Sequence, residues 1–184
     1  MRTLISSTAG MVLSIPKANA DTENIYIKRS VNKYEKNKLQ EAILDLDKAI
    51  KINKYNDISH ALRGIINREL NNFEGAILDF TSAIRINPNV ADYYFSRGEA
   101  KLYSIDQINI IAVNDQSRVD KTRKSAISDF NKAIKINPKN LDAYLYRGYA
   151  KLMISDLKGA CEDWLFLKSS GNLDAKTEIE QYCN

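Results

Sequence analysis

Few side chains in this sequence could carry out chemistry near neutral pH. The chain of 184 residues holds one histidine, His60, and two cysteines, Cys161 and Cys183. A lone histidine argues against a histidine-based active site, and two cysteines 22 positions apart fit no zinc-binding spacing. The sequence also lacks a glycine-rich phosphate loop and a serine in a nucleophile motif. It therefore predicts no catalytic residues, no metal site and no cofactor, and leaves an enzyme of unknown reaction as the weakest alternative.

The charge balance argues against nucleic acid as a partner. The chain has 27 lysines and arginines against 23 aspartates and glutamates, a formal net charge of +4. A nucleic-acid-binding domain concentrates more positive charge than this.

Only seven glycines and three prolines are present, which argues against a loop-rich all-β fold. The repeats described next predict the helices that position the functional side chains.

Recurring phrases show how those helices are organised. The segment 76–88 (AILDFTSAIRINP) returns at 126–138 (AISDFNKAIKINP) with nine identities, and a third copy lies at 42–53 (AILDLDKAIKIN). A second phrase, RGEAKL at 97–102, returns as RGYAKL at 147–152. Two phrases that recur in the same order predict a stack of similar helical units.

The spacing of small and large residues resembles the tetratricopeptide repeat. The interval from Gly64 to Gly98 equals the period of that repeat, about 34 residues. Within one unit Gly64 is followed by small Ala76, aromatic Phe80 and a closing Pro88. Small side chains let two antiparallel helices approach, and proline ends the second helix. The resemblance implies an all-α fold, a right-handed superhelical array of about four helix-turn-helix hairpins with a C-terminal capping helix.

One unit is degenerate and another is too long. The first has Ser30 where the others have glycine, and the third exceeds the period because of an insertion near 106–122. One interpretation of this insertion is purely structural, a longer pair of helices or a loop. The other is functional, with apolar residues that fold over the binding groove or dock a partner (Ile108, Ile110, Ile111 and Val113). The expected domain covers 21–184, with units at about 23–56, 57–90, 91–140 and 141–174 and a cap at 174–183.

Each unit combines an arginine in its first helix with an aspartate in its second, where the family more often has apolar or aromatic residues. Because both positions differ together in all four units, we predict an ion pair inside each hairpin, partly buried and important for register. Four arginines could instead form an anion site, but each has its own aspartate. The pairs are Arg29–Asp45, Arg63–Asp79, Arg97–Asp129 and Arg147–Asp163.

The resemblance also implies which residues meet a partner. In this family the ligand-facing side chains come from the first helix of each hairpin and line a concave groove. Here those positions lack the lysine, asparagine and arginine of the clamp that grips a C-terminal carboxylate. We expect an apolar and aromatic groove for an amphipathic or extended segment, unless these side chains pack against neighbouring hairpins. The expected partner-binding residues are Leu62, Ile65, Phe95, Glu99, Leu145, Tyr146 and Tyr149, with the two tyrosines the strongest candidates.

The two cysteines fall near the end of the array. Cys161 would lie on the second helix of the last hairpin and Cys183 near the end of the capping helix. In an exported protein a disulfide between them would hold the cap in place, worth about 3 kcal/mol for a loop of this length. Without export, two buried free thiols are the default. The ending GACEDW followed by YC also resembles the C-terminus of many bacterial proteins of this repeat type.

Residues 1–20 have the layout of a secretory signal. They contain no acidic residue, begin with Arg2, continue with mostly apolar or small side chains and end in Ala18-Asn19-Ala20, a form that signal peptidase accepts. The alternative is a disordered cytosolic tail. Cleavage after Ala20 would place the protein in the periplasm, a lumen or outside the cell, and a chain without cleavage would be cytoplasmic. No later stretch is apolar enough to span a membrane.

These features predict an adaptor or scaffold that binds a segment of another protein and could assist complex assembly. The alternative is a self-assembling structural module, in which the degenerate first hairpin docks on a second copy to form a homo-oligomer.

Overall fold

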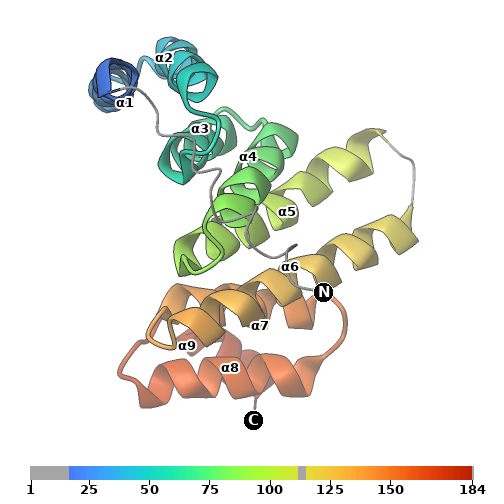
Figure 1. Cartoon of the computed structure of the whole chain (residues 1–184). Coiled ribbons are helices and arrows are strands. Elements are labelled where there is room, and N and C mark those ends of the chain that lie inside the picture. Colours follow the sequence, from blue (N-terminus) through green and yellow to red (C-terminus); the bar gives the residue numbers. More distant parts are fainter. Residues whose placement is uncertain (1–16, 112–114, 184) are drawn as a thin grey trace, which may run out of the picture.

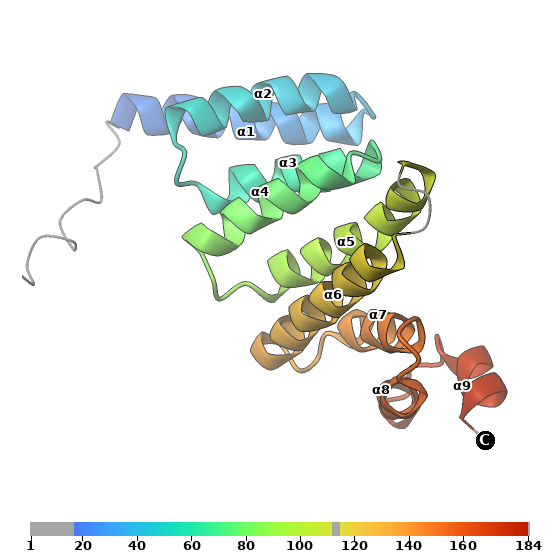
Figure 2. The same ribbon diagram turned by 90° about the vertical axis from the view of Figure 1, so that its right-hand side faces the viewer.

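The computed structural model describes residues 17–111 and 115–183 of the chain, and within these ranges it consists of α-helices joined by short turns. Figures 1 and 2 show the helices arranged as successive antiparallel pairs that stack on one another. The helices are α1 (Lys17–Glu35), α2 (Leu39–Ile52), α3 (Asp57–Glu69), α4 (Phe73–Ile86), α5 (Ala91–Ile111), α6 (Gln116–Ile136), α7 (Leu141–Leu152), α8 (Leu157–Ser169) and α9 (Lys176–Tyr182).

Each of the helices α1, α3, α5 and α7 packs against the helix that follows it, and each hairpin then packs on the next. The hairpins are α1/α2, α3/α4, α5/α6 and α7/α8, and the short helix α9 packs against α8. The predicted all-α superhelical array of about four hairpins with a C-terminal cap is therefore confirmed.

Polar residues at the turns explain where the helices begin and end. Asn72 and Asp156 accept hydrogen bonds from the backbone N–H groups of the first turns of α4 and α8, as N-caps do. Inside three hairpins the turn contains a residue with positive φ, namely Asn37 at 57°, Asn71 at 59° and Ser155 at 65°. This left-handed conformation is tolerated best by short polar side chains and reverses the chain in few residues.

The hairpin cores follow a rule of matched sizes. A Cβ atom added to Gly64 would lie 3.1 Å from the ring of Phe80, and one added to Gly148 would lie 2.3 Å from the Trp164 indole. The glycine therefore lets an aromatic residue of the second helix lie directly against the first helix. The degenerate first hairpin has buried Ser30 and buried Leu46 at the corresponding positions, where a larger first-helix residue stands opposite a smaller second-helix residue.

The insertion lengthens both helices of the third hairpin. Helices α5 and α6 have 21 residues each, whereas the helices of the second and fourth hairpins have 12 to 14. Their connected ends project beyond the neighbouring hairpins, as Figure 1 shows. Of the structural alternatives for the insertion, a longer pair of helices or a loop, the backbone shows the longer pair of helices. The side chains of residues 106–114 lie outside the described part, so a docking role for Ile108, Ile110, Ile111 and Val113 stays a prediction.

The expected signal segment also falls largely outside the described residues, which begin at Lys17. Helix α1 continues through Ala20 and Asp21, the expected cleavage position, so cleavage would leave a helix that starts at or near the new N-terminus. Export and cleavage stay predictions. Within the described ranges no helix is both long enough and apolar enough to cross a membrane.

Candidate partner-binding face

The first helices of successive hairpins contact one another through polar side chains along one face, which we call the first-helix face. The Tyr34 hydroxyl of α1 donates to Glu69 of α3, and Arg68 of α3 pairs with Glu99 of α5. Between α5 and α7 the hydroxyls of Tyr103 and Tyr146 lie 3.2 Å apart, and Tyr149 of α7 donates to Glu178 of α9 at 2.9 Å. Every junction along this face is therefore bridged by a polar contact, including the junction with the cap.

Aromatic side chains of the chain itself occupy the C-terminal half of this face. Tyr146 packs edge-on against Phe95 with ring centroids 5.6 Å apart and against Tyr149 at 6.5 Å. Tyr149 in turn lies edge-on to buried Trp164 at 5.7 Å. The hydrogen bond to Tyr103, followed by burial, raises the pKa of the Tyr146 hydroxyl, which stays protonated at neutral pH. This half of the face is thus a packed and uncharged stack of rings.

Glu99 lies beside this stack and is only 8% exposed. Burial raises the pKa of its carboxyl group, while Arg68 and the Tyr146 hydroxyl act in the opposite direction. Glu99 is therefore a carboxylate paired within the chain rather than a free group that faces a partner.

A groove of about 300 Å3 lies in the N-terminal half of the face, between α1 and α3. Its wall is mostly apolar. Val31 is 36% exposed there, so its side chain is accessible to a partner. The lining residues are Ser30, Val31, Tyr34 and Glu35 from α1 and Leu62, Ile65 and Ile66 from α3.

The structure therefore separates the seven residues expected from the sequence to bind a partner. Leu62 and Ile65 line the groove. Leu145 packs against the cluster around Trp164, and the others belong to the ring stack or to the buried ion pair (Phe95, Tyr146, Tyr149 and Glu99). Sequence reasoning missed Val31 and Tyr34. Val31 stands one repeat period before Ile65, so the equivalent position in the degenerate first unit was the available signal.

The structure brings together all four arginine–aspartate pairs named from the sequence. The shortest N–O distances are 3.3 Å for Arg29–Asp45, 2.6 Å for Arg63–Asp79, 2.6 Å for Arg97–Asp129 and 2.5 Å for Arg147–Asp163. In three of the pairs the arginine side chain is also largely buried, at 16 to 24% exposed, but Arg29 is 51% exposed.

Each of these three buried arginines has a second partner that sequence reasoning missed. In each case the Nη1 atom donates a hydrogen bond to a residue of the preceding hairpin. Arg63 donates to Asp47 at 2.6 Å, Arg97 to Thr81 at 3.1 Å and Arg147 to Asn131 at 2.7 Å. The sequence separation from the arginine is the same in all three, but the chemical type of the partner changes, so no recurring residue marked it. The guanidinium groups are thus engaged in links within and between hairpins, which leaves them unsuited to an anion site.

The single histidine also has a structural position. His60 is 8% exposed, with Nε2 lying 3.2 Å from the Lys54 carbonyl oxygen and Nδ1 lying 3.6 Å from Asp79. Burial would raise the pKa of Asp79, but its contacts with His60, Arg63 and Asn67 hold that pKa below its usual value. The described residues contain no group of three or more histidine, cysteine, aspartate or glutamate side chains arranged to hold a metal ion.

Comparisons with solved structures identify the architecture. MamA is similar with a TM-score of 0.68 and 20% identity, over 88% of this chain and 84% of its own. The first repeat domain of Spaghetti, bound to an HSP90 peptide, gives a TM-score of 0.63 at 18% identity, over 73% of this chain and 94% of its own. The second repeat domain of human RPAP3, in complex with an HSP70 peptide, gives 0.59 at 20% identity, over 74% and 98%. The fold is tetratricopeptide-like.

No family model matches the sequence, and no curated protein matches it significantly. The similarity in sequence to the solved structures is low, so these comparisons establish the fold rather than an activity. Most of the similar solved structures are not named as enzymes, although one is an O-GlcNAc transferase of Thermobaculum terrenum, of which this chain covers 22%.

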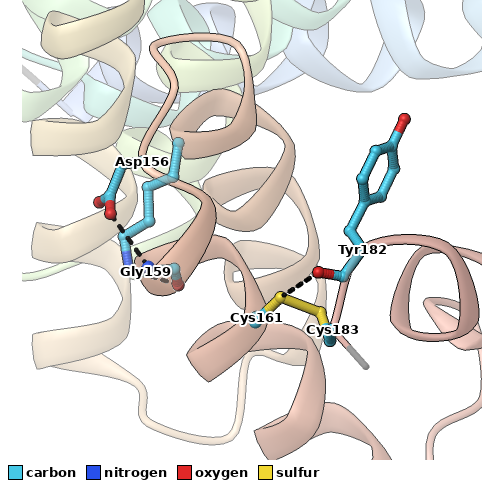
Figure 3. Close-up of a disulfide and its surroundings, with 6 residues drawn as sticks. Asp156, Gly159, Cys161, Tyr182 and Cys183 are labelled. Carbon is cyan, nitrogen blue, oxygen red and sulfur yellow. Dashed lines mark hydrogen bonds between the residues drawn. A yellow bond between two sulfur atoms is a disulfide. The ribbon is translucent and has the colours of Figure 1, made fainter.

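In the tetratricopeptide-like array, α9 lies where the first helix of a fifth hairpin would begin. Ile179 and Ala175 complete an apolar cluster with Trp164 and Leu167 of α8. A disulfide joins Cys161 of α8 to Cys183, which directly follows α9, and Figure 3 shows the bond beside the Tyr182 carbonyl. The cap therefore covers the last hairpin and is covalently attached to it.

Proposed function

We propose that this protein binds a segment of another protein along its first-helix face, with the groove between α1 and α3 as the anchoring site. The observation that carries this proposal is the apolar wall of that groove, which includes accessible Val31 in a volume of about 300 Å3. A groove of this kind accepts one or two apolar side chains of an extended or helical segment. The role is that of an adaptor or scaffold, with assembly of a complex as one use.

Two of the structurally similar domains were solved with peptides, one with an HSP90 peptide and one with an HSP70 peptide. This supports peptide binding as a use of the tetratricopeptide-like fold. The seven expected partner-binding positions of the present chain contain no lysine, asparagine or arginine. We therefore do not propose that this chain binds an HSP90 or HSP70 peptide.

A capture experiment with two surface variants tests the proposal. The chain from Asp21 and its Val31→Glu variant are used to capture proteins from native extract, with Leu78→Glu as the matched control. Leu78 is 65% exposed on α4, so this control adds the same charge outside the groove. We expect a partner that is retained by wild type and by the control and lost with Val31→Glu. Equal capture by all three would exclude the groove as the anchoring site.

A second copy of the chain is the alternative partner, and the first hairpin favours it. The arginines of the later hairpins reach back to a preceding hairpin, whereas Arg29 has no hairpin before it among the described residues and is 51% exposed. Another copy that stacks on α1 and α2 would supply such a contact. Light scattering over a hundredfold concentration range tests this, and a constant monomer mass would exclude it.

We also propose that the protein acts after export, in the periplasm, a lumen or outside the cell. The disulfide between Cys161 and Cys183 supports this, because disulfides persist in oxidising compartments. Fractionation of the native cells tests the proposal, and recovery of the intact chain from the cytosol would contradict it.

A further inference from the structure

We infer that the segment bound in the groove between α1 and α3 carries a lysine or arginine next to its apolar anchor. This inference rests on the proposed function and concerns the chemistry of the partner. It follows from two glutamates at the groove, neither of which forms an ion pair with another described residue.

The two glutamates come from opposite sides of the groove. Glu35, at the end of α1, is one of its lining residues. Glu69, at the end of α3, accepts the hydrogen bond of the Tyr34 hydroxyl, and Tyr34 itself lines the groove. The hydrogen bond to Glu69 is the main cause of a raised pKa of the Tyr34 hydroxyl, so Tyr34 remains a neutral donor to this carboxylate. Both glutamates are exposed to solvent.

The nearby basic residues are engaged elsewhere or form no pair. Arg68 precedes Glu69 in the chain and its charge acts on the nearby Tyr34 hydroxyl, but its ion pair is with Glu99 of the next hairpin. Lys33, on α1, lies 2.8 Å from buried Asp45 in the hairpin core, and Lys38 pairs with Glu41. Exposed Lys36 forms no ion pair with either glutamate. Among the described residues, Glu35 and Glu69 therefore have no cationic partner, and the groove has an apolar wall with two negative charges at one end.

This arrangement selects between segments of opposite charge. A guanidinium or ammonium group that pairs with either carboxylate while its segment occupies the apolar groove gains charge-assisted hydrogen bonds. An acidic segment would instead place its charges beside two carboxylates that have no ion-pair partner among the described residues. The peptides bound by the similar Spaghetti and RPAP3 domains both end in Glu-Glu-Val-Asp. The groove of the present chain should reject such an ending.

Selection from a random dodecapeptide display library tests the inference and does not require the partner to be identified. The chain from Asp21 and its Glu35→Gln, Glu69→Gln double variant are the two targets. The matched control is Glu162→Gln, which removes an exposed carboxylate from α8, far from the groove. We expect wild type and control to select a large apolar residue with lysine or arginine within four positions. The double variant should select the apolar residue alone.

The affinity of one selected peptide then measures the charge contribution. Its binding should weaken on the order of tenfold with the double variant, and replacing its basic residue by glutamine should produce the same loss without a further effect of the double variant. Apolar or acidic peptides selected equally by all three proteins would overturn the inference and leave the proposed function standing. If no selected peptide is sensitive to Val31→Glu, the groove is not the binding site and both proposals fail.

Discussion

The matched sizes in the hairpin cores lead to a graded prediction for three glycine-to-alanine variants. A new Cβ atom would lie 3.1 Å from Phe80 in Gly64→Ala, 2.7 Å from Phe130 in Gly98→Ala and 2.3 Å from Trp164 in Gly148→Ala. Contacts below 3.0 Å force a neighbour to move, and the rings of Phe130 and Trp164 are fully buried. We therefore expect the free energy of unfolding to fall in this order, with Gly148→Ala the most destabilising.

The magnitude follows from two opposing effects. Replacing glycine by alanine inside a helix stabilises it by about 1 kcal/mol through backbone entropy. Overpacking a buried site costs about 1 to 3 kcal/mol, and we assign the upper value to Gly148→Ala because its Cβ atom would make the shortest contact, 2.3 Å from the buried indole of Trp164. The expected net loss is about 2 kcal/mol for Gly148→Ala, with Gly64→Ala close to neutral.

Urea unfolding followed by circular dichroism measures the series. Ser128→Ala on the exposed surface of α6 controls for helix propensity without a packing change. A second test combines Gly148→Ser with Trp164→Leu, which reproduces the Ser30 and Leu46 combination of the first hairpin, and the double variant should be more stable than the sum of the two single changes predicts. Equal stabilities for the three alanine variants, or a reversed order, would refute the size argument.

Four further predictions concern the links and charges of the array. Replacing Cys183 by serine should remove about 3 kcal/mol from the stability of the cap, because the disulfide closes a 22-residue separation. Amide hydrogen exchange should then become faster in α9, while the exchange rates in α3 stay unchanged. Arg63→Met should lower the free energy of unfolding by about 3 kcal/mol, since it leaves buried Asp79 without its arginine. Arg29→Met should cost under about 1 kcal/mol, because Arg29 is half-exposed and Lys33 remains 2.8 Å from the same aspartate; equal losses in urea would contradict this difference. The pKa of Glu99 is raised in the folded state, so protonation of this carboxyl group stabilises the fold. This stabilisation is fully present below the unfolded pKa of 4.5 and is lost as the pH rises through the folded pKa. Wild type should therefore gain stability relative to Glu99→Gln as the pH falls from 7 to 4.5, and a constant difference would be inconsistent with the raised pKa. Expression of the whole chain in a bacterial host should yield an exported product whose first residue is Asp21, and N-terminal sequencing that begins at Met1 in the cytosol would disprove the signal.

The sequence predicted the ion pairs within the hairpins because each partner recurs at its own fixed position in every unit. Arg147 and Asp163, for example, stand at the same places in the repeat as Arg63 and Asp79, and the joint occurrence of arginine and aspartate in every unit indicates contact. The links between hairpins have no such recurrence. One position holds Asp47 in the first unit and Thr81 in the second, and only the stacked structure shows that both accept a hydrogen bond from an arginine.

The groove was harder to predict than the fold for a similar reason. Repeat positions indicate which side chains lie on the first-helix face, but they do not indicate whether another part of the chain covers them. Tyr149 stands at an expected partner-facing position, and its hydroxyl instead donates to Glu178 of the cap. Val31 lies in the degenerate unit, where the repeat pattern is weakest, and it is accessible because no earlier helix of the described chain packs over it.

The covalent attachment of the cap has a mechanical consequence. A pulling force applied to the C-terminal end of the chain reaches Cys183 and passes through the sulfur–sulfur bond directly into α8 at Cys161. Helix α9 and the turn before it lie within the bridged loop and carry almost no tension, so they do not unravel first. The load instead acts on the first turn of α8 and its packing against α7, and then on the contact between α6 and α7, which is held by Arg147 and Asn131 and by packed rings. In reducing solution the same force would peel away α9 at low tension, so the oxidised and reduced forms should differ in their first extension step.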